Sequence, residues 1–100
     1  MPSIKLTPEL LEEKAGNLRS TAARNDDVIA RLDGLIEALN ADWEGDAYNA
    51  FRESYAQKRA TFESFTEDME IFASFLVKFA DIMRQEEKRQ TDVARQLAGN

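Results

Sequence analysis

The chain has 100 residues and a formal net charge of -6, with 43% hydrophobic and 32% charged residues. This size and balance predict one small folded domain over residues 1–100 and exclude a disordered chain. There is no cysteine and no histidine, which excludes disulfides and thiol nucleophiles and removes the commonest general base and metal ligand. An acidic chain also argues against nucleic-acid binding, because that function needs a concentrated basic face.

No hydrophobic run approaches the ~20 residues that span a bilayer, so we expect no stable membrane insertion. The N-terminal residues 1–6 lack the charged-then-apolar layout of a signal peptide. If the protein leaves the cell, we therefore expect a route that does not read an N-terminal signal.

A first helix is predicted from about Pro8 to Asn40. Thr7 is a suitable N-cap, Pro8 fits the first helical position, and Glu9 favours the positive end of the helix dipole. A spacing that alternates four and three residues then places an almost wholly apolar stripe on one face of the helix. The stripe consists of Leu11, Ala15, Leu18, Ala22, Asn25, Ile29, Leu32, Ile36 and Leu39.

A turn is predicted at residues 41–46, where the first stripe ends at Trp43. Gly45 can adopt backbone angles that are closed to other residues, and Asp46 is a good N-cap for a following helix. The chain is therefore expected to fold back about Trp43 into an antiparallel, all-α helical hairpin.

A second helix is predicted over about residues 46–97. Its stripe again alternates three and four residues, and it consists of Tyr48, Phe51, Tyr55, Lys58, Phe62, Phe65, Met69, Phe72, Leu76, Phe79, Met83, Glu86, Gln90, Val93 and Leu97. Folding about Trp43 would place Pro8 beside Lys78, so the chain beyond about Met83 would have no partner within the hairpin. We expect residues 84–100 to project as a tail that frays when nothing binds it.

Five phenylalanines fall within residues 62–79, and two helices cannot enclose so wide a stripe. At about 25 cal/mol per Å2, leaving several aromatic side chains in water forfeits several kcal/mol. We therefore expect a second hairpin to complete a four-helix bundle, as a homodimer or as a pair with a related protein. The core and dimer stripe is predicted to include Leu18, Ile29, Leu32, Ile36, Leu39, Phe51, Phe62, Phe65, Phe72 and Phe79.

Two polar residues interrupt these stripes, Asn25 in the first helix and Lys58 in the second. They either fix the register or partner choice of the bundle, as buried polar residues can, or reach solvent at its edge.

Catalytic chemistry is not expected. Adjacent acids such as Glu12 and Glu13 point about 100° apart on a helix and do not converge on one atom. Di-metal sites in bundles need Glu-x-x-His pairs, and this chain has no histidine. No phosphate-binding loop, nucleophile elbow or zinc spacing occurs in the sequence. We predict no catalytic residue, no metal and no cofactor.

The placement of Trp43-x-Gly45 between two amphipathic helices, in a chain of this length, resembles the WXG-100 family of ESAT-6-like proteins. Residues 4–9, and Asp42-Trp43-Glu44-Gly45 followed by Ala47 and Phe51, are similar to members from low-GC Gram-positive bacteria. The resemblance implies a helical-hairpin dimer that a membrane ATPase of type VII secretion exports without a cleaved signal. It also implies that Trp43 and Gly45 form the turn, near the partner chain's tail.

The family's export signal is a tyrosine followed four residues later by an acid, beyond the hairpin overlap. This chain departs from it, because Tyr48 and Tyr55 lie early and are followed by Arg52 and Arg59. The best counterpart is Ile82 with Glu86, and Val93 continues the apolar contacts. The alternative is that Ile82 belongs to an ordinary core and Glu86 to an ordinary surface.

The leading hypothesis is a non-enzymatic, dimeric substrate of a type VII secretion system, cytoplasmic before export and extracellular afterwards. An alternative is an adaptor or targeting chaperone that pairs with the helical N-terminal domain of a larger secreted toxin. A third is a cytosolic helical scaffold unrelated to secretion.

Overall fold

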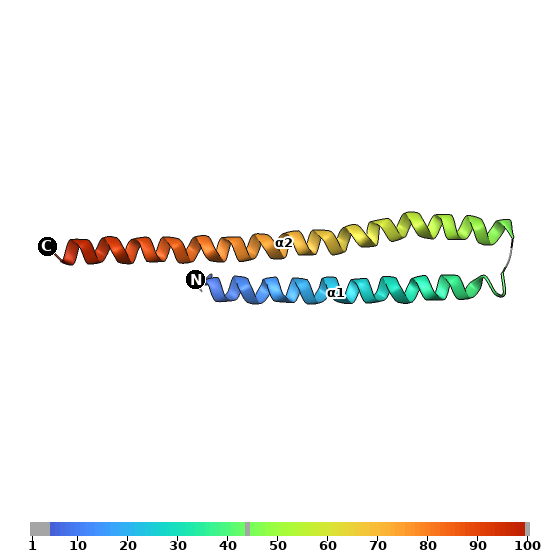
Figure 1. The fold of residues 1–100 in the computed structure, drawn as a ribbon, viewed down its shortest axis with the longest axis horizontal. Helices are drawn as coiled ribbons and strands as arrows, with labels where there is room; N and C mark the ends of the chain where they lie inside the picture. Colours follow the sequence, from blue (N-terminus) through green and yellow to red (C-terminus); the bar gives the residue numbers. More distant parts are fainter. Residues whose placement is uncertain (1–4, 44, 100) are drawn as a thin grey trace.

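A computed structural model describes residues 5–43 and 45–99 and shows two long helices folded into an antiparallel hairpin (Figure 1). Helix α1 spans Pro8–Leu39 and helix α2 spans Asp46–Ala98. Both helices end within a residue of the predicted bounds, which confirms the all-α hairpin. Residues Ile4, Glu44 and Asn100, which belong to the predicted motifs and tail, lie outside the described residues.

The two helices begin in different ways. In α1 the Thr7 hydroxyl accepts a hydrogen bond from the Leu10 N–H at 3.0 Å, which confirms the predicted N-cap. The N-cap of α2 is Gly45, with φ of 103°, and no side chain caps this helix. The prediction of Asp46 as the cap is therefore wrong by one residue. Asp46 lies in the first turn instead, where its negative charge favours the positive end of the helix dipole.

The molecule is a rod of 83 × 24 × 21 Å with a radius of gyration of 23.3 Å. A compact domain of this length has a radius of gyration of about 13 Å. Helix α2 continues well past the start of α1 (Figure 1), and every described residue from Gln85 to Gly99 is exposed. A chain of this shape has far more surface than its own contacts can cover.

The hairpin overlap is longer than folding about Trp43 predicts. Arg84, rather than Lys78, lies beside the start of α1, where it pairs with Glu12 at 2.7 Å and with Glu9 at 3.6 Å. The reason is that helical hydrogen bonding continues past α1, since the Trp43 N–H donates to the Leu39 carbonyl at 2.8 Å. The chain therefore reverses at Gly45, and the two helices overlap as far as Arg84.

The stripe predicted for α1 faces α2. Leu11, Ala15, Ala22 and Ile29 are buried, and the other members of the stripe are half-buried, apart from Leu39 at 40% exposure. The four-and-three spacing thus identified the inner face of this helix.

The stripe predicted for α2 divides between two faces. Tyr48 is buried, and residues at seven-residue intervals after it (Tyr55, Met69, Leu76 and Met83) are half-buried against α1, with Phe62 at the margin. The alternating members, among them Phe51, Phe65, Phe72 and Phe79, are 39–57% exposed. The predicted stripe therefore contains an inner row and an outer row.

Small side chains fill the middle of the inner seam. Ala15, Ala22, Ala73 and Ala80 are at most 1% exposed. Ala73 and Ala80 were not among the predicted core residues, because the stripe of α2 was defined by its large apolar residues. Small residues at a helix contact allow the two axes to approach closely. Phe65, Phe72, Phe75 and Phe79 accordingly lie outside the seam, and Phe62 lies at its margin.

Candidate functional site

The turn is stabilised by aromatic contacts. Trp43 is 37% exposed, and its ring lies 5.9 Å from the Tyr48 ring, edge to face, and 5.4 Å from the Phe51 ring. Tyr48 is 4% exposed and donates a hydrogen bond from its hydroxyl to the Ile36 carbonyl at 3.0 Å. The indole thus packs against the first turns of α2 and remains partly exposed to solvent.

Gly45 permits the reversal because its φ of 103° lies in a region that residues with a Cβ rarely adopt. A Cβ built there meets no atom within 4 Å. The requirement for glycine is therefore set by backbone conformation and not by crowding. The structure places both predicted turn residues, Trp43 and Gly45, at the reversal.

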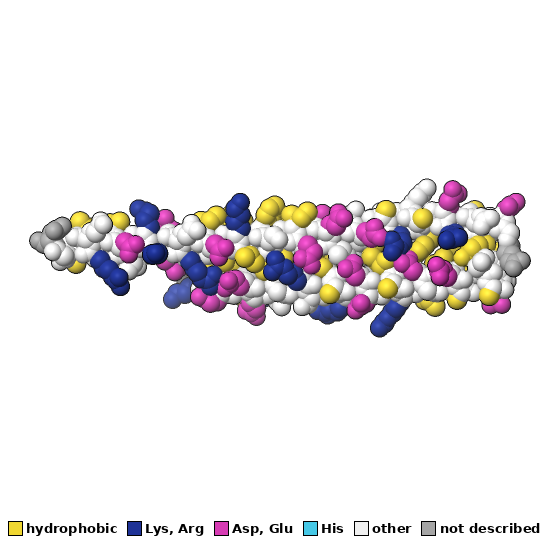
Figure 2. All heavy atoms as spheres, viewed as in Figure 1, with side chains coloured by type: hydrophobic (Ala, Val, Ile, Leu, Met, Phe, Trp, Pro, Cys, Tyr) yellow, Lys and Arg dark blue, Asp and Glu magenta, His cyan; other side chains and the backbone are white. Residues whose placement is uncertain are grey.

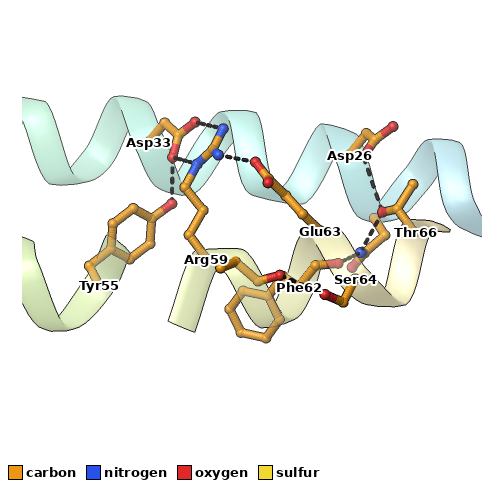
Figure 3. Close-up of polar contacts among 10 residues, drawn as sticks. Asp26, Asp33, Tyr55, Arg59, Phe62, Glu63, Ser64 and Thr66 are labelled. Atoms are coloured by element: carbon orange, nitrogen blue, oxygen red, sulfur yellow. Dashed lines mark hydrogen bonds and ion pairs between the residues drawn. The ribbon is translucent and has the colours of Figure 1, made fainter. Parts of the chain in front are cut away.

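A network of polar side chains joins the helices between the turn and the middle of the hairpin (Figure 3). The Arg59 guanidinium donates to both carboxylate oxygens of Asp33, at 2.8 and 2.9 Å, and also pairs with Glu63. The Tyr55 hydroxyl donates to Asp33 at 2.6 Å. Sequence reasoning missed this network, although folding the chain about Gly45 brings Asp33 level with Tyr55 and Arg59.

Asp33, Tyr55 and Arg59 have pKa values shifted by their surroundings in this network. Hydrogen bonds from Arg59, and then from Tyr55, hold the pKa of Asp33 below its ordinary value. Partial burial, followed by the hydrogen bond to Asp33, raises the pKa of Tyr55. The hydrogen bonds to Asp33 raise the pKa of Arg59. One guanidinium thus pairs with two carboxylates, and its contact with Asp33 links the two helices.

A second polar contact involves Asn25. Its amide donates to the Phe62 carbonyl and to the Thr66 hydroxyl, both at 2.9 Å, and Thr66 in turn donates to Asp26 at 3.1 Å. Asn25 is thus half-buried, and its side-chain amide forms its hydrogen bonds within the hairpin. Lys58 is exposed, so these two polar residues do not meet within one chain.

The outer face of α2 carries most of the exposed aromatic surface. Phe62, Phe65, Phe72, Phe75 and Phe79 are 37–57% exposed, and Ile82 is 48% exposed. A shallow hollow of about 350 Å3 lies among Phe75, Phe79, Ile82 and Lys78. Apolar side chains accordingly line the edge of the rod that α2 forms (Figure 2). Exposed aromatic side chains gathered on one face of a helix are typical of an interaction site.

The tail is a charged continuation of α2. Glu86 pairs with Arg89 at 2.7 and 3.1 Å and accepts a hydrogen bond from Gln90 at 3.4 Å. The bond from Arg89 lowers the pKa of Glu86. Val93, one of the residues suggested by the export signal, is 42% exposed. Ile82, Glu86 and Val93 thus all lie on accessible surface of one helix.

Within residues 5–43 and 45–99, no group of three or more acidic residues is arranged to hold a metal ion. In the same residues, neither helix is long and apolar enough to cross a bilayer. The accessible features that remain are the turn, the outer aromatic face and the tail.

Comparison with known proteins places these features in a family. The model of the WXG100 family, described as proteins of 100 residues with WXG, matches residues 3–88. An uncharacterized protein of Clostridium acetobutylicum is 27% identical over 85 residues, which are 85% of this chain and 88% of the relative.

Solved structures agree with this match. The secreted protein EsxB of Bacillus anthracis is 32% identical with a TM-score of 0.80, over 87% of this chain and 99% of the EsxB chain. EsxA of Geobacillus thermodenitrificans is 28% identical with a TM-score of 0.78, over 89% of this chain and 97% of the EsxA chain. The match over most of the chain, the Trp43-x-Gly45 turn and the hairpin fold agree, and this protein belongs to the WXG100 family.

Proposed function

We propose that this protein is a small, non-enzymatic substrate of a type VII secretion system, exported as a dimer without cleavage of an N-terminal signal. The single observation that carries the proposal is the outer aromatic face of a hairpin whose inner seam is already filled. Family membership supports the secretory role, as does the likeness to EsxB, which is described as a secreted protein.

The dimer follows from the energetics of the outer face. Five phenylalanines remain 37–57% exposed in the single chain. Fully burying one exposed aromatic side chain is worth about 1.5–3 kcal/mol. Because these five are already about half-buried, covering them contributes several kcal/mol in all, which is comparable with the stability of a small domain. A second hairpin supplies an apolar face of the same length and completes a four-helix bundle.

Recognition by the secretion ATPase is assigned to the turn and the tail. Trp43 and Gly45 form an end of the hairpin, and Ile82, Glu86 and Val93 form a helical surface that extends past the hairpin overlap. The Glu86 carboxylate supplies the acidic group of the export signal, and Ile82 stands in place of the tyrosine. Neither residue is needed by the inner seam, since Ile82 is 48% exposed and Glu86 pairs within its own helix.

The test is export from cells that carry or lack the ATPase. We expect the protein in the medium of intact cells, with its N-terminal residues retained, and we expect it to be lost from the medium when the ATPase gene is deleted. A cytosolic marker measured in the same medium controls for lysis. Continued appearance of the protein in the medium of intact, ATPase-deleted cells would contradict the proposal.

Substitutions separate recognition from folding. Trp43→Ala, Gly45→Ala and Glu86→Gln should each reduce export by more than they reduce the fraction of folded protein, as measured by circular dichroism. If export and the fraction of folded protein fell equally, these residues would have only a structural role.

A second candidate function rests on the same aromatic face. An adaptor would use that face to complete a bundle with the helical N-terminal domain of a larger secreted toxin. The two functions differ in the purified chain, because a stable homodimer favours the secreted substrate and a poorly folded monomer favours the adaptor.

A further inference from the structure

The outer surface of α2 carries a row of side chains spaced seven residues apart. Phe65, Phe72 and Phe79 form its middle, with exposures of 54%, 56% and 57%. The same spacing continues to Phe51 at 39% exposure and to Val93 at 42%. A seven-residue spacing keeps side chains on one side of a helix that winds around a neighbour in a left-handed supercoil. The row is therefore suited to pack along another helix.

Two charged residues interrupt this row, and their positions are symmetrical. Lys58 lies two heptads before Phe72, and Glu86 lies two heptads after it. Both side chains are exposed, and Lys58 does not contact Asn25, the polar residue on the inner face. The charges thus have opposite sign and stand at equal distances from the middle of the row.

We infer that the row pairs with the same row of a second copy, antiparallel, about a two-fold axis at Phe72. This inference rests on the dimer of the proposed function and specifies its interface. Across the axis Phe72 meets its own copy and Phe65 meets Phe79 of the second copy. Phe51 meets Val93, and Lys58 meets Glu86. Every apolar member of the row faces an apolar partner, and each charge faces its opposite.

Other heptad registers lose this match. Moving the axis half a heptad toward the N-terminus sets Lys58 against Phe79 and Phe51 against Glu86. Moving it half a heptad toward the C-terminus sets Lys58 against Val93 and Phe65 against Glu86. Each of these registers buries two charges against apolar groups, which is costly. The charges therefore select one register, as polar residues do in coiled coils.

The lengths of the helical segments fit the same axis. Helix α2 runs from Asp46 to Ala98, and Phe72 is its middle residue. In the paired row, residues 85–98 of one copy therefore lie beside residues 46–59 of the other. The tail extends past the start of α1 (Figure 1), and its described residues beyond Arg84 are exposed. In the pair, the far end of the tail reaches the start of α2 in the second copy.

Distances between two copies test the register directly. The chain has no cysteine, so Gln57→Cys introduces one labelling site, on an exposed residue outside the row. With a rise of 1.5 Å per residue, the axis at Phe72 places two spin labels about 45 Å apart along the bundle. Shifting the axis by half a heptad changes this to about 35 or 55 Å. Pulsed dipolar spectroscopy should give the middle distance, and either of the others would overturn the inference.

Charge reversal gives a second test. Lys58→Glu and Glu86→Lys should each weaken the dimer about tenfold in sedimentation equilibrium, because each change affects two symmetrical pairs. The double variant should recover the original dissociation constant. Glu87→Lys, one residue outside the row, is the control and should change the constant less than threefold. A double variant as weak as the two single effects combined would overturn the pairing.

Both tests are made on purified protein and do not use export as their readout. A dimer with another spacing overturns the register and leaves the secretion proposal intact. A dimer that has the expected spacing but is not exported would support the register and contradict the secretion proposal.

Discussion

The inner seam and the outer face of α2 lie on one helix and differ in side-chain size and in what covers them. The seam contains Ala73 and Ala80, both fully buried, whereas the outer face contains Phe72 and Phe79, both more than half exposed. The small residues allow α1 and α2 to pack against each other within the chain. The large residues form a second apolar face that α1 does not cover. The difference is what we expect of a hairpin that folds around alanine and that, as we propose, assembles through phenylalanine.

The largest expected effect comes from removing the centre of the outer face. Phe72→Ala should weaken the dimer about 100-fold in sedimentation equilibrium, because each dimer loses two aromatic side chains at the middle of its interface. The helix content at high protein concentration should be retained, since Phe72 is 56% exposed in the single chain. An unchanged dissociation constant would show that Phe72 lies outside the interface.

Placing a larger side chain in the inner seam should have the next largest effect. Ala73→Leu should lower the free energy of unfolding by about 2 kcal/mol, because a fully buried position between two close helices has no space for three more carbons. Urea unfolding at fixed protein concentration measures the change. Ala60→Leu, at an exposed position of α2, is the control and should stay within about 0.5 kcal/mol of the parent. Equal effects at both positions would contradict a filled seam.

The glycine of the turn and the glycine near the end of α1 should respond to alanine in opposite ways. Gly45→Ala should destabilise the chain by about 1 kcal/mol, because alanine is strained at a φ of 103°. Gly34→Ala should stabilise it by about 1 kcal/mol, since this residue is helical and a Cβ there meets nothing within 4 Å. Urea unfolding of both variants checks the signs, and a stabilising change at Gly45 would contradict the proposed role of its backbone angle.

The smallest effect is expected in the polar network, where Asp33→Asn should lower the urea midpoint slightly at neutral pH. The pKa of Asp33 is lower in the folded chain than its ordinary 3.8, so this group stabilises the fold above that value. Its contribution is lost as the pH falls through the folded pKa. The difference in urea midpoint between the parent and Asp33→Asn should therefore become smaller at acid pH. Asp27→Asn, an exposed carboxylate on the same helix, is the matched control.

The sequence was sufficient for the helices, the turn and the inner face of α1. Capping at Thr7, glycine at position 45 and an unbroken apolar spacing are local signals, and they act through local conformation. The inner face of α2 was not predicted correctly. Two rows, one with Ala73 and one with Phe72, both repeat every seven residues, and the choice between them depends on how closely α1 approaches.

The polar network escaped prediction for a related reason. Asp33 and Arg59 resemble ordinary surface residues, and Tyr55 a member of the apolar stripe, until the reversal point of the chain is known. Moving that point from Trp43 to Gly45 brings these residues level. Which residues face each other across a hairpin thus depends on the position of the turn to within one or two residues. The sequence signals for helices do not locate the turn that closely.

Sedimentation equilibrium of the purified chain tests the central claim most directly, namely that a second copy covers the outer aromatic face. The account predicts a well-folded dimer of twice the chain mass of 11.4 kDa. A stable, fully helical monomer of 11.4 kDa at micromolar concentration would contradict it.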